Sequence, residues 1–150
     1  MIKNRRITLR RLLVPKIVPS DSELIAIFNE IRNKQSEKKN TIVYTGTHDN
    51  QTLVGWYKAL TPYQKRKICA NFKQYKERTC CERILHSCFD SIADLVILPM
   101  QDLLHYGDET RMNTPGTIGS PNWEWKLVSL KPFEKQLTLY KKLIQSSKRN

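Results

Sequence analysis

The sequence lacks long apolar runs, and this absence limits the classes of protein that it can encode. No stretch approaches the roughly 18 consecutive apolar residues of a membrane-spanning helix, so we expect no membrane span. The basic N-terminus, MIKNRRITLRRLLVPK, has apolar stretches too short and too interrupted for a signal peptide, and no small-residue cleavage site follows them. We therefore expect a cytoplasmic protein.

Cysteine is scarce, and its spacing argues against a metal centre. Cys69, Cys80, Cys81 and Cys88 form no CxxC pair, and adjacent cysteines are a poor zinc pattern. His86 lies two residues before Cys88, but no second ligand pair accompanies it. We expect reduced thiols that are mostly buried on helices, and neither a metal ion nor another cofactor.

Acidic residues are few beside the basic ones. The chain has 26 Lys and Arg against 14 Asp and Glu, which gives a formal net charge of +12 and suggests nucleic acid as a partner. The positive charge is concentrated in residues 1–16, 65–83 and 131–150, whereas residues 94–126 contain five acids and two bases. Because a charge run is usually a solvated face, nucleic-acid binding is the less favoured alternative.

Hydrophobic patterning predicts an α/β chain with two short strands. Residues 41–44 (TIVY) and 95–98 (LVIL) are continuous apolar runs bounded by turn residues, which is typical of buried strands. About 50 mostly helical residues separate them, so they cannot form a hairpin. We expect parallel strands, both fully buried beneath covering helices.

Helical periodicity accounts for most of the remaining residues. Helices are predicted at 20–34, 53–60, 61–75, 82–92, 102–104 and 133–146. Capping boxes mark two of their starts, Ser20 with Glu23 and Thr61 with Gln64. The apolar stripe of the last helix comprises Phe133, Leu137, Tyr140 and Ile144. Residues 1–19 are expected to form a basic, poorly ordered arm, and residues 20–150 form the remaining unit.

Polar side chains follow both predicted strands. The first strand is followed by TGTHDN, and in β/α barrels catalytic groups lie just past the carboxyl ends of strands. One interpretation is that Asp49 caps the next helix and His48 forms a hydrogen bond below it. The other is that Asp49 stabilises the oxocarbenium-like transition state of a sugar ring while His48 donates to a ring hydroxyl. Local sequence leaves both open and slightly favours the helix cap.

The second strand is followed by PMQD and then by a polar loop that contains Arg111, Asn113 and two tryptophans. Trp123 and Trp125 alternate in NWEW and would suit stacking on sugars, although each is individually more typical of a core residue. Arg111 is expected to form an ion pair with Asp108 or Glu109 rather than to contact a ligand.

Two long blocks of this sequence resemble a known family. TIVYTGTHDNQTLVGWY (residues 41–57) and ADLVILPMQDLLHYGDETRMNTPGTIGSPNWEWKL (residues 93–127) closely resemble the C-terminal part of the 4-α-glucanotransferases, or amylomaltases. The resemblance covers about residues 41–145. It implies a partial (β/α)₈ TIM barrel, consisting of the last two βα units with flanking helices and mostly helical by residue count.

The resemblance also implies an activity, the retaining transfer of α-1,4-glucan segments between maltooligosaccharides or to glucose, without a cofactor. Asp49 matches the family's carboxylate that stabilises the transition state, and His48 and Asn113 match substrate-binding residues. Further candidate substrate contacts are Asn50, Gln101, Asp102 and Arg111. The implied partners are α-1,4-glucans and the missing N-terminal part of the barrel, and neither a membrane nor nucleic acid is expected.

The sequence departs from the family pattern in several places. The family's R-x-D-H motif, which carries the nucleophile, and its A-E-D-L-G motif, which carries the acid/base, do not occur. Residues 1–35 show no match, Gln51 stands where the family usually has Asp, and residues 119–122 (GSPN) replace a shorter G-N. We therefore expect a fragment that is inactive alone. The alternatives are a non-catalytic glucan-binding remnant and half of a split enzyme.

Overall fold

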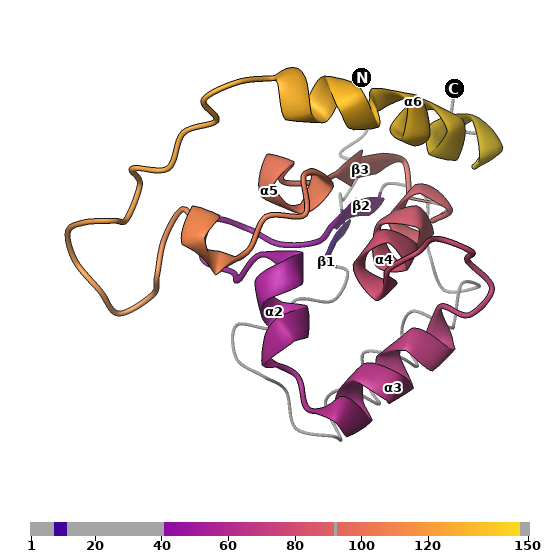
Figure 1. The fold of residues 1–150 in the computed structure, drawn as a ribbon, viewed down its shortest axis with the longest axis horizontal. Helices are drawn as coiled ribbons and strands as arrows, with labels where there is room; N and C mark the ends of the chain where they lie inside the picture. Colours follow the sequence, from indigo (N-terminus) through magenta and orange to yellow (C-terminus); the bar gives the residue numbers. More distant parts are fainter. Residues whose placement is uncertain (1–7, 12–40, 92, 148–150) are drawn as a thin grey trace, which may run out of the picture.

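A three-stranded parallel sheet lies at the centre of the computed structural model, which describes residues 8–11, 41–91 and 93–147 (Figure 1). The strands are β1 (Thr8–Arg11), β2 (Thr41–Tyr44) and β3 (Leu95–Ile97), in that order across the sheet. Ile42 is paired with Leu95 and Tyr44 with Ile97, both in a parallel register. The prediction that the two apolar runs form parallel strands is confirmed.

Strand β1 was not predicted, because its sequence TLRR has no apolar run that would mark a buried strand. Its residues pair with β2 from Thr8 opposite Thr41 to Arg11 opposite Tyr44. It falls within residues 1–19, where we expected an arm without regular structure. The helix predicted at 20–34 lies outside the described residues.

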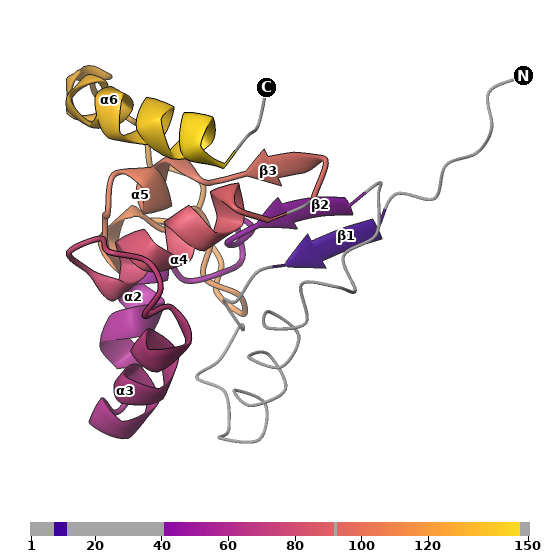
Figure 2. The ribbon, with the colours of Figure 1, turned by 90° about the vertical axis from the view of Figure 1, so that its right-hand side faces the viewer.

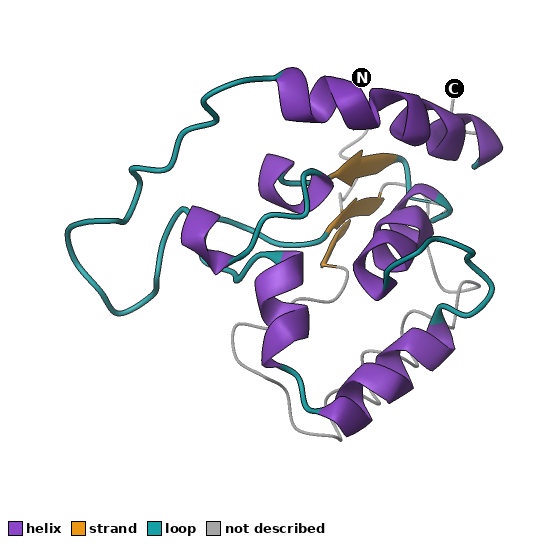
Figure 3. Cartoon of the chain, in the orientation of Figure 1, coloured by secondary structure: helices purple, strands orange, loops and turns teal. Residues whose placement is uncertain are grey.

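Helices follow the strands in the expected order. They are α2 (Leu53–Ala59), α3 (Pro62–Asn71), α4 (Cys80–Phe89), α5 (Met100–Leu103), the 3₁₀ helix η2 (Asp108–Thr110) and α6 (Lys131–Ser146). Helix α6 lies on the β3 side of the sheet, and a long loop joins it to η2 (Figures 2 and 3). In the described part of the chain, no helix is both long and apolar enough to cross a membrane.

Side-chain caps define where the helices begin. The predicted capping box at Thr61 is confirmed, since Thr61 accepts from the Gln64 amide at 3.2 Å and Gln64 returns a bond to the Thr61 amide at 3.0 Å. A second capping box at Thr79 and Glu82 was missed, and it makes α4 begin two residues earlier than predicted. These caps satisfy amide groups that the first helical turn leaves without a partner.

The main core lies between β2 and helices α2, α3 and α4. Trp56, Ile68, Phe72 and Ile84 are fully buried there. The cysteines behave as expected, because all four are reduced thiols, three are buried, and Cys69 is half-buried. Burial raises the pKa of the Cys81 thiol to about 12.

A smaller cluster attaches α6 to the rest of the structure. Phe89 of α4 packs with Tyr140 and Leu143 of α6, and the Tyr140 hydroxyl donates to the Leu103 carbonyl oxygen. The buried face of α6 is therefore rotated from the predicted stripe, because Leu143 is buried while Ile144 is 39% exposed.

The prediction that both apolar strands are fully buried is wrong for β3 and only partly right for β2, where Ile42 and Tyr44 are half-buried. Leu95 and Ile97 are 48% and 52% exposed, whereas Val43 of β2 is completely buried. Leu95 and Ile97 are two residues apart and therefore lie on the same face of β3, so this face is the exposed one. An apolar run indicates a tendency to be buried but does not supply the covering element.

The cap at Thr79 provides a test of the helix assignment. We expect Thr79→Ala to lower the free energy of unfolding by about 1 kcal/mol, because the Glu82 amide loses its acceptor. Urea denaturation of the 150-residue chain measures this change. The matched control is Thr138→Ala at an exposed position within α6, which should be neutral or slightly stabilising. Equal effects of the two substitutions would contradict the cap.

Candidate functional site

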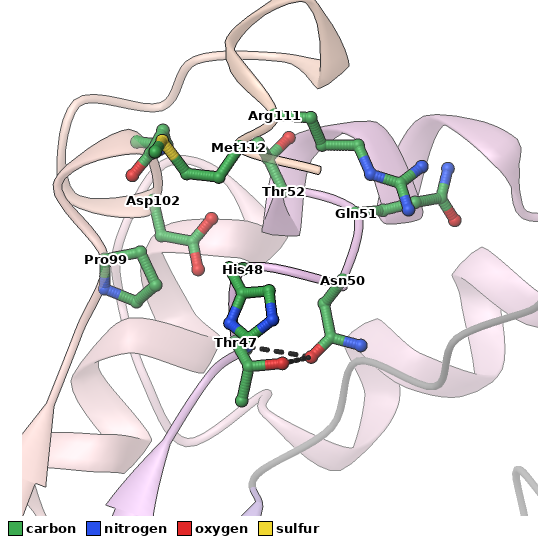
Figure 4. A pocket seen from close by; sticks show the side chains of 11 residues that line it. Thr47, His48, Asn50, Gln51, Thr52, Pro99, Asp102, Arg111 and Met112 are labelled. Carbon is green, nitrogen blue, oxygen red and sulfur yellow. Dashed lines mark hydrogen bonds between the residues drawn. The ribbon is translucent and has the colours of Figure 1, made fainter. Parts of the chain in front are cut away.

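The candidate site lies where β2 and β3 end. These strands are parallel neighbours, so the segments that follow them emerge at the same edge of the sheet. A pocket of about 150 Å³ lies between the two segments (Figure 4). Its lining residues are Gly46, Thr47, His48, Asn50, Gln51 and Thr52 after β2, and Pro99, Gln101, Asp102, Arg111 and Met112 after β3.

Asp49 is held by residues from both segments. Asn113 Nδ2 donates to Asp49 Oδ1 at 2.7 Å, and His48 Nε2 lies 3.3 Å from the same oxygen. Arg111 Nη2 donates to the Asp49 backbone carbonyl at 3.1 Å, rather than pairing with Asp108 or Glu109 as expected. The structure thus brings His48 and Asp49 together with Arg111 and Asn113, which lie more than 60 positions later in the sequence.

The N-cap of α2 is Thr52, whose hydroxyl accepts from the Gly55 amide at 3.1 Å. Asp49 lies three residues earlier and is therefore not the cap, so the structure removes the helix-cap interpretation that local sequence slightly favoured. The Asp49 carboxylate instead contacts Asn113 and His48, and its neighbours His48 and Asn50 line the pocket.

Asn50 shapes the turn that carries Asp49. Its side-chain oxygen accepts from the Thr47 amide at 2.8 Å and from the Thr47 hydroxyl at 3.0 Å. Its amide nitrogen is buried and has no hydrogen-bond partner among the described residues. Asn50 also lines the pocket, so an amide donor without a partner among the described residues lies next to the site.

Asp102 connects the two ends of the loop between β2 and α2. One carboxylate oxygen accepts from the Thr45 hydroxyl, and the other accepts from the Leu53 amide at 2.7 Å. Asp102 is only 2% exposed, and this burial raises the pKa of its carboxyl group although both hydrogen bonds act in the opposite direction. Its neighbour Gln101 donates to the Thr110 carbonyl at 3.2 Å.

Asp108 makes a second connection beside the first. It accepts from the Thr52 amide at 3.0 Å and from Gln51 Nε2 at 2.7 Å. This explains Gln51 physically, because an Asp at position 51 could not donate to a carboxylate. Gly55 permits the close approach, since a Cβ atom there would lie 2.1 Å from Asp108 Oδ1.

Sequence reasoning missed the contacts of Thr45 and Asp108 in this arrangement, and for Trp123 it favoured core packing over stacking on a sugar. Trp123, which we expected to pack, is 59% exposed, and its ring centroid lies 4.9 Å from that of His48. These contacts join residues that are far apart in the sequence, and no local sequence pattern predicts them. Within the described ranges, no group of three His, Cys, Asp or Glu side chains is arranged to hold a metal ion.

The raised pKa of Asp102 leads to a prediction about stability and pH. The folded chain binds this proton more tightly than the unfolded chain, whose value is near the ordinary 3.8. The associated stabilisation is therefore complete below that pH and is lost as pH rises through the folded-state pKa. We expect Asp102→Asn to raise the free energy of unfolding at pH 7 and to flatten its pH dependence, because the Asn oxygen can accept from the Leu53 amide while its NH2 group donates to the Thr45 hydroxyl.

Asp102→Ala is the matched contrast, because it leaves the Leu53 amide and the Thr45 hydroxyl without an acceptor. A loss of about 1–3 kcal/mol per donor is expected from urea denaturation at several pH values. If the Asn variant kept the wild-type pH dependence, burial of a charged Asp102 would not be the source of that dependence.

Comparisons with known proteins are consistent with this geometry. The family profile of 4-alpha-glucanotransferases matches residues 20–131. The match begins upstream of β2, so the expectation that resemblance is absent before residue 35 is wrong for residues 20–35.

Individual relatives are also 4-alpha-glucanotransferases. The 4-alpha-glucanotransferase of Streptococcus pneumoniae is 39% identical over 100 residues, which cover 66% of this chain and 19% of the relative. The chloroplastic enzyme of Solanum tuberosum is 34% identical over 99 residues, covering 66% and 17% respectively. The chain therefore spans less than a fifth of the length of these curated relatives.

A solved structure agrees with the sequence comparison. An amylomaltase from Streptococcus agalactiae, determined in complex with acarbose, superposes with a TM-score of 0.70 at 30% sequence identity. The superposition covers 81% of this chain and 24% of the amylomaltase. With the profile match over residues 20–131, these comparisons show that the chain belongs to the 4-alpha-glucanotransferase family.

Proposed function

We propose that this chain is part of an enzyme that transfers α-1,4-glucan segments between sugar acceptors with retention of configuration. The observation that carries the proposal is the 2.7 Å hydrogen bond from Asn113 to Asp49, which unites two motifs 64 residues apart in one site. In this proposal, β2 and β3 with their following segments are the last two βα units of a (β/α)₈ barrel, and residues 20–150 form its C-terminal part. The amylomaltase neighbour supports this arrangement.

Asp49 is proposed to stabilise the transition state. Positive charge develops on the sugar ring as the glycosidic bond breaks, and a carboxylate held in a fixed position stabilises that charge without reorganising. Asn113 orients one Asp49 oxygen, while Arg111 fixes the backbone at the same residue. The carboxylate is thus positioned before a substrate arrives.

The remaining polar groups are proposed to bind hydroxyls of an α-1,4-glucan. His48 is about half exposed at the pocket, and Asn50 presents a buried donor. Imidazole and amide groups both donate and accept hydrogen bonds, as sugar hydroxyls do. In contrast, Gln101 and Asp102 are buried and already bonded to protein groups, which supports a framework role for them over direct contact.

Catalysis in this proposal requires groups that these 150 residues do not contain. A retaining enzyme needs a nucleophile and an acid/base, and the two motifs that carry them in the family are absent from the sequence. The proposed partner is therefore a polypeptide that supplies the earlier barrel strands. A non-catalytic glucan-binding role is the second candidate, and the same absence favours it.

We also propose that the chain acts in the cytoplasm. Its four cysteines are reduced thiols, and reducing compartments preserve thiols. The plant relative named above is chloroplastic, so the family is not confined to one compartment.

The proposal can be tested by maltotriose disproportionation. The purified chain alone should give no turnover above background. Addition of a polypeptide that carries the preceding part of the Streptococcus agalactiae amylomaltase should produce activity if the two parts complete a barrel. Asp49→Asn in the mixture should lower kcat about 10²–10³-fold, because the substitution removes charge at nearly constant shape.

Asp94→Asn is the matched control, since it removes an exposed carboxylate next to the opposite end of β3. It should leave kcat of the mixture unchanged. Turnover by the isolated chain that Asp49→Asn abolishes would contradict the requirement for missing groups. Acarbose binding by a mixture without turnover would favour the non-catalytic role.

A further inference from the structure

Trp123 combines two features that core packing does not explain. Its backbone has a φ of 65°, in the left-handed region that bulky residues rarely adopt. Such a conformation costs on the order of 1–3 kcal/mol. Its side chain is nevertheless 59% exposed, so burial offsets little of this cost.

The loop that contains Trp123 is held by hydrogen bonds that do not involve the indole ring. The Trp123 amide donates to the Met112 carbonyl oxygen at 2.6 Å. The adjacent Asn122 accepts from the Thr114 amide at 2.8 Å and donates to the Thr117 hydroxyl at 2.8 Å. The loop thus closes on itself across residues 112–123, and the indole is not needed to fix its path.

The indole ring lies beside the candidate site. Its centroid is 4.9 Å from that of the His48 ring, with an angle of 39° between the ring planes. His48 Nε2 is in turn 3.3 Å from Asp49 Oδ1. A partly exposed aromatic surface therefore adjoins the proposed transition-state carboxylate at the rim of the pocket.

We propose that Trp123 is a binding platform for one glucose unit of an α-1,4-glucan. A pyranose ring presents C–H groups on one face, and these carry a small positive charge that the negative face of an aromatic ring attracts. Hydroxyl groups at the ring edge remain available to neighbours such as His48. This inference rests on the proposed function, because it takes the same class of substrate at the same site.

The test is an NMR titration of the ¹⁵N-labelled 150-residue chain with acarbose, combined with urea denaturation. Trp123→Gly removes the ring and places glycine where φ is positive, so stability should be unchanged or higher. The dissociation constant for acarbose should rise at least about tenfold. Trp123→Phe keeps an aromatic face and should restore most of the affinity.

Ile118→Ala is the matched control, because Ile118 is fully exposed in the same loop. It should change neither binding nor stability. Unchanged acarbose binding by Trp123→Gly would overturn the inference while leaving the proposed function intact. Weaker binding that is accompanied by an equal loss of stability in Trp123→Gly would also overturn it, because the ring would then be structural. Absence of binding by the folded, unsubstituted chain would contradict glucan recognition by these residues as a whole.

Discussion

The carboxylate of Asp102 accepts one hydrogen bond from Thr45 and another from Leu53, and the shape of the pocket depends on this shared acceptor. Thr45 follows the last residue of β2, and Leu53 is the first residue of α2. The seven residues between them form the loop that carries Asp49. Because Asp102 is shielded from water, its two bonds are stronger than they would be at a surface, and a change at either donor would be costly.

Asp108 holds the start of α2 in the same way as Asp102, one residue earlier in the chain. It bonds to the Thr52 amide, so two carboxylates engage consecutive amides at the start of α2. These amides have no acceptor within the helix, and the two aspartates supply one for each. Asp102 and Asp108, which both follow β3, therefore form a framework that fixes the loop between β2 and α2. The side chains that line the pocket after β2 belong to this loop.

The division between framework and pocket explains how a chain much shorter than its relatives can hold this geometry. The hydrogen bonds that join Asp49 to Asn113 and Arg111 lie within the chain. The loop that carries Asp49 is connected to Asp102 and Asp108, which also belong to it. The arrangement of the proposed transition-state carboxylate is thus local, whereas the proposed glycosyl transfer would also need a nucleophile and an acid/base.

The sequence predicted the parallel pair of strands because apolar runs separated by helical residues have few other solutions. It predicted the cap at Thr61 because that signal is contained in four residues. It could not choose between a cap and a site for Asp49, since both use a carboxylate after a strand. The contacts of Asp102 lie 49 and 57 positions away, and no local pattern encodes them. Likewise, a run such as LVIL reports apolar character but not what packs against it.

The exposure of β3 has a consequence for how the molecule behaves in solution. A strand at the edge of a sheet offers backbone donors and acceptors to any segment that can align with it. Among the described residues, β3 occupies such an edge and has Leu95 and Ile97 about half exposed on it. A further parallel strand placed there would satisfy the backbone groups at the edge, whereas covering Leu95 and Ile97 requires an element packed on the face of the sheet. The exposed edge of β3 is therefore a site at which chains can associate, and such association increases with the concentration of the chain.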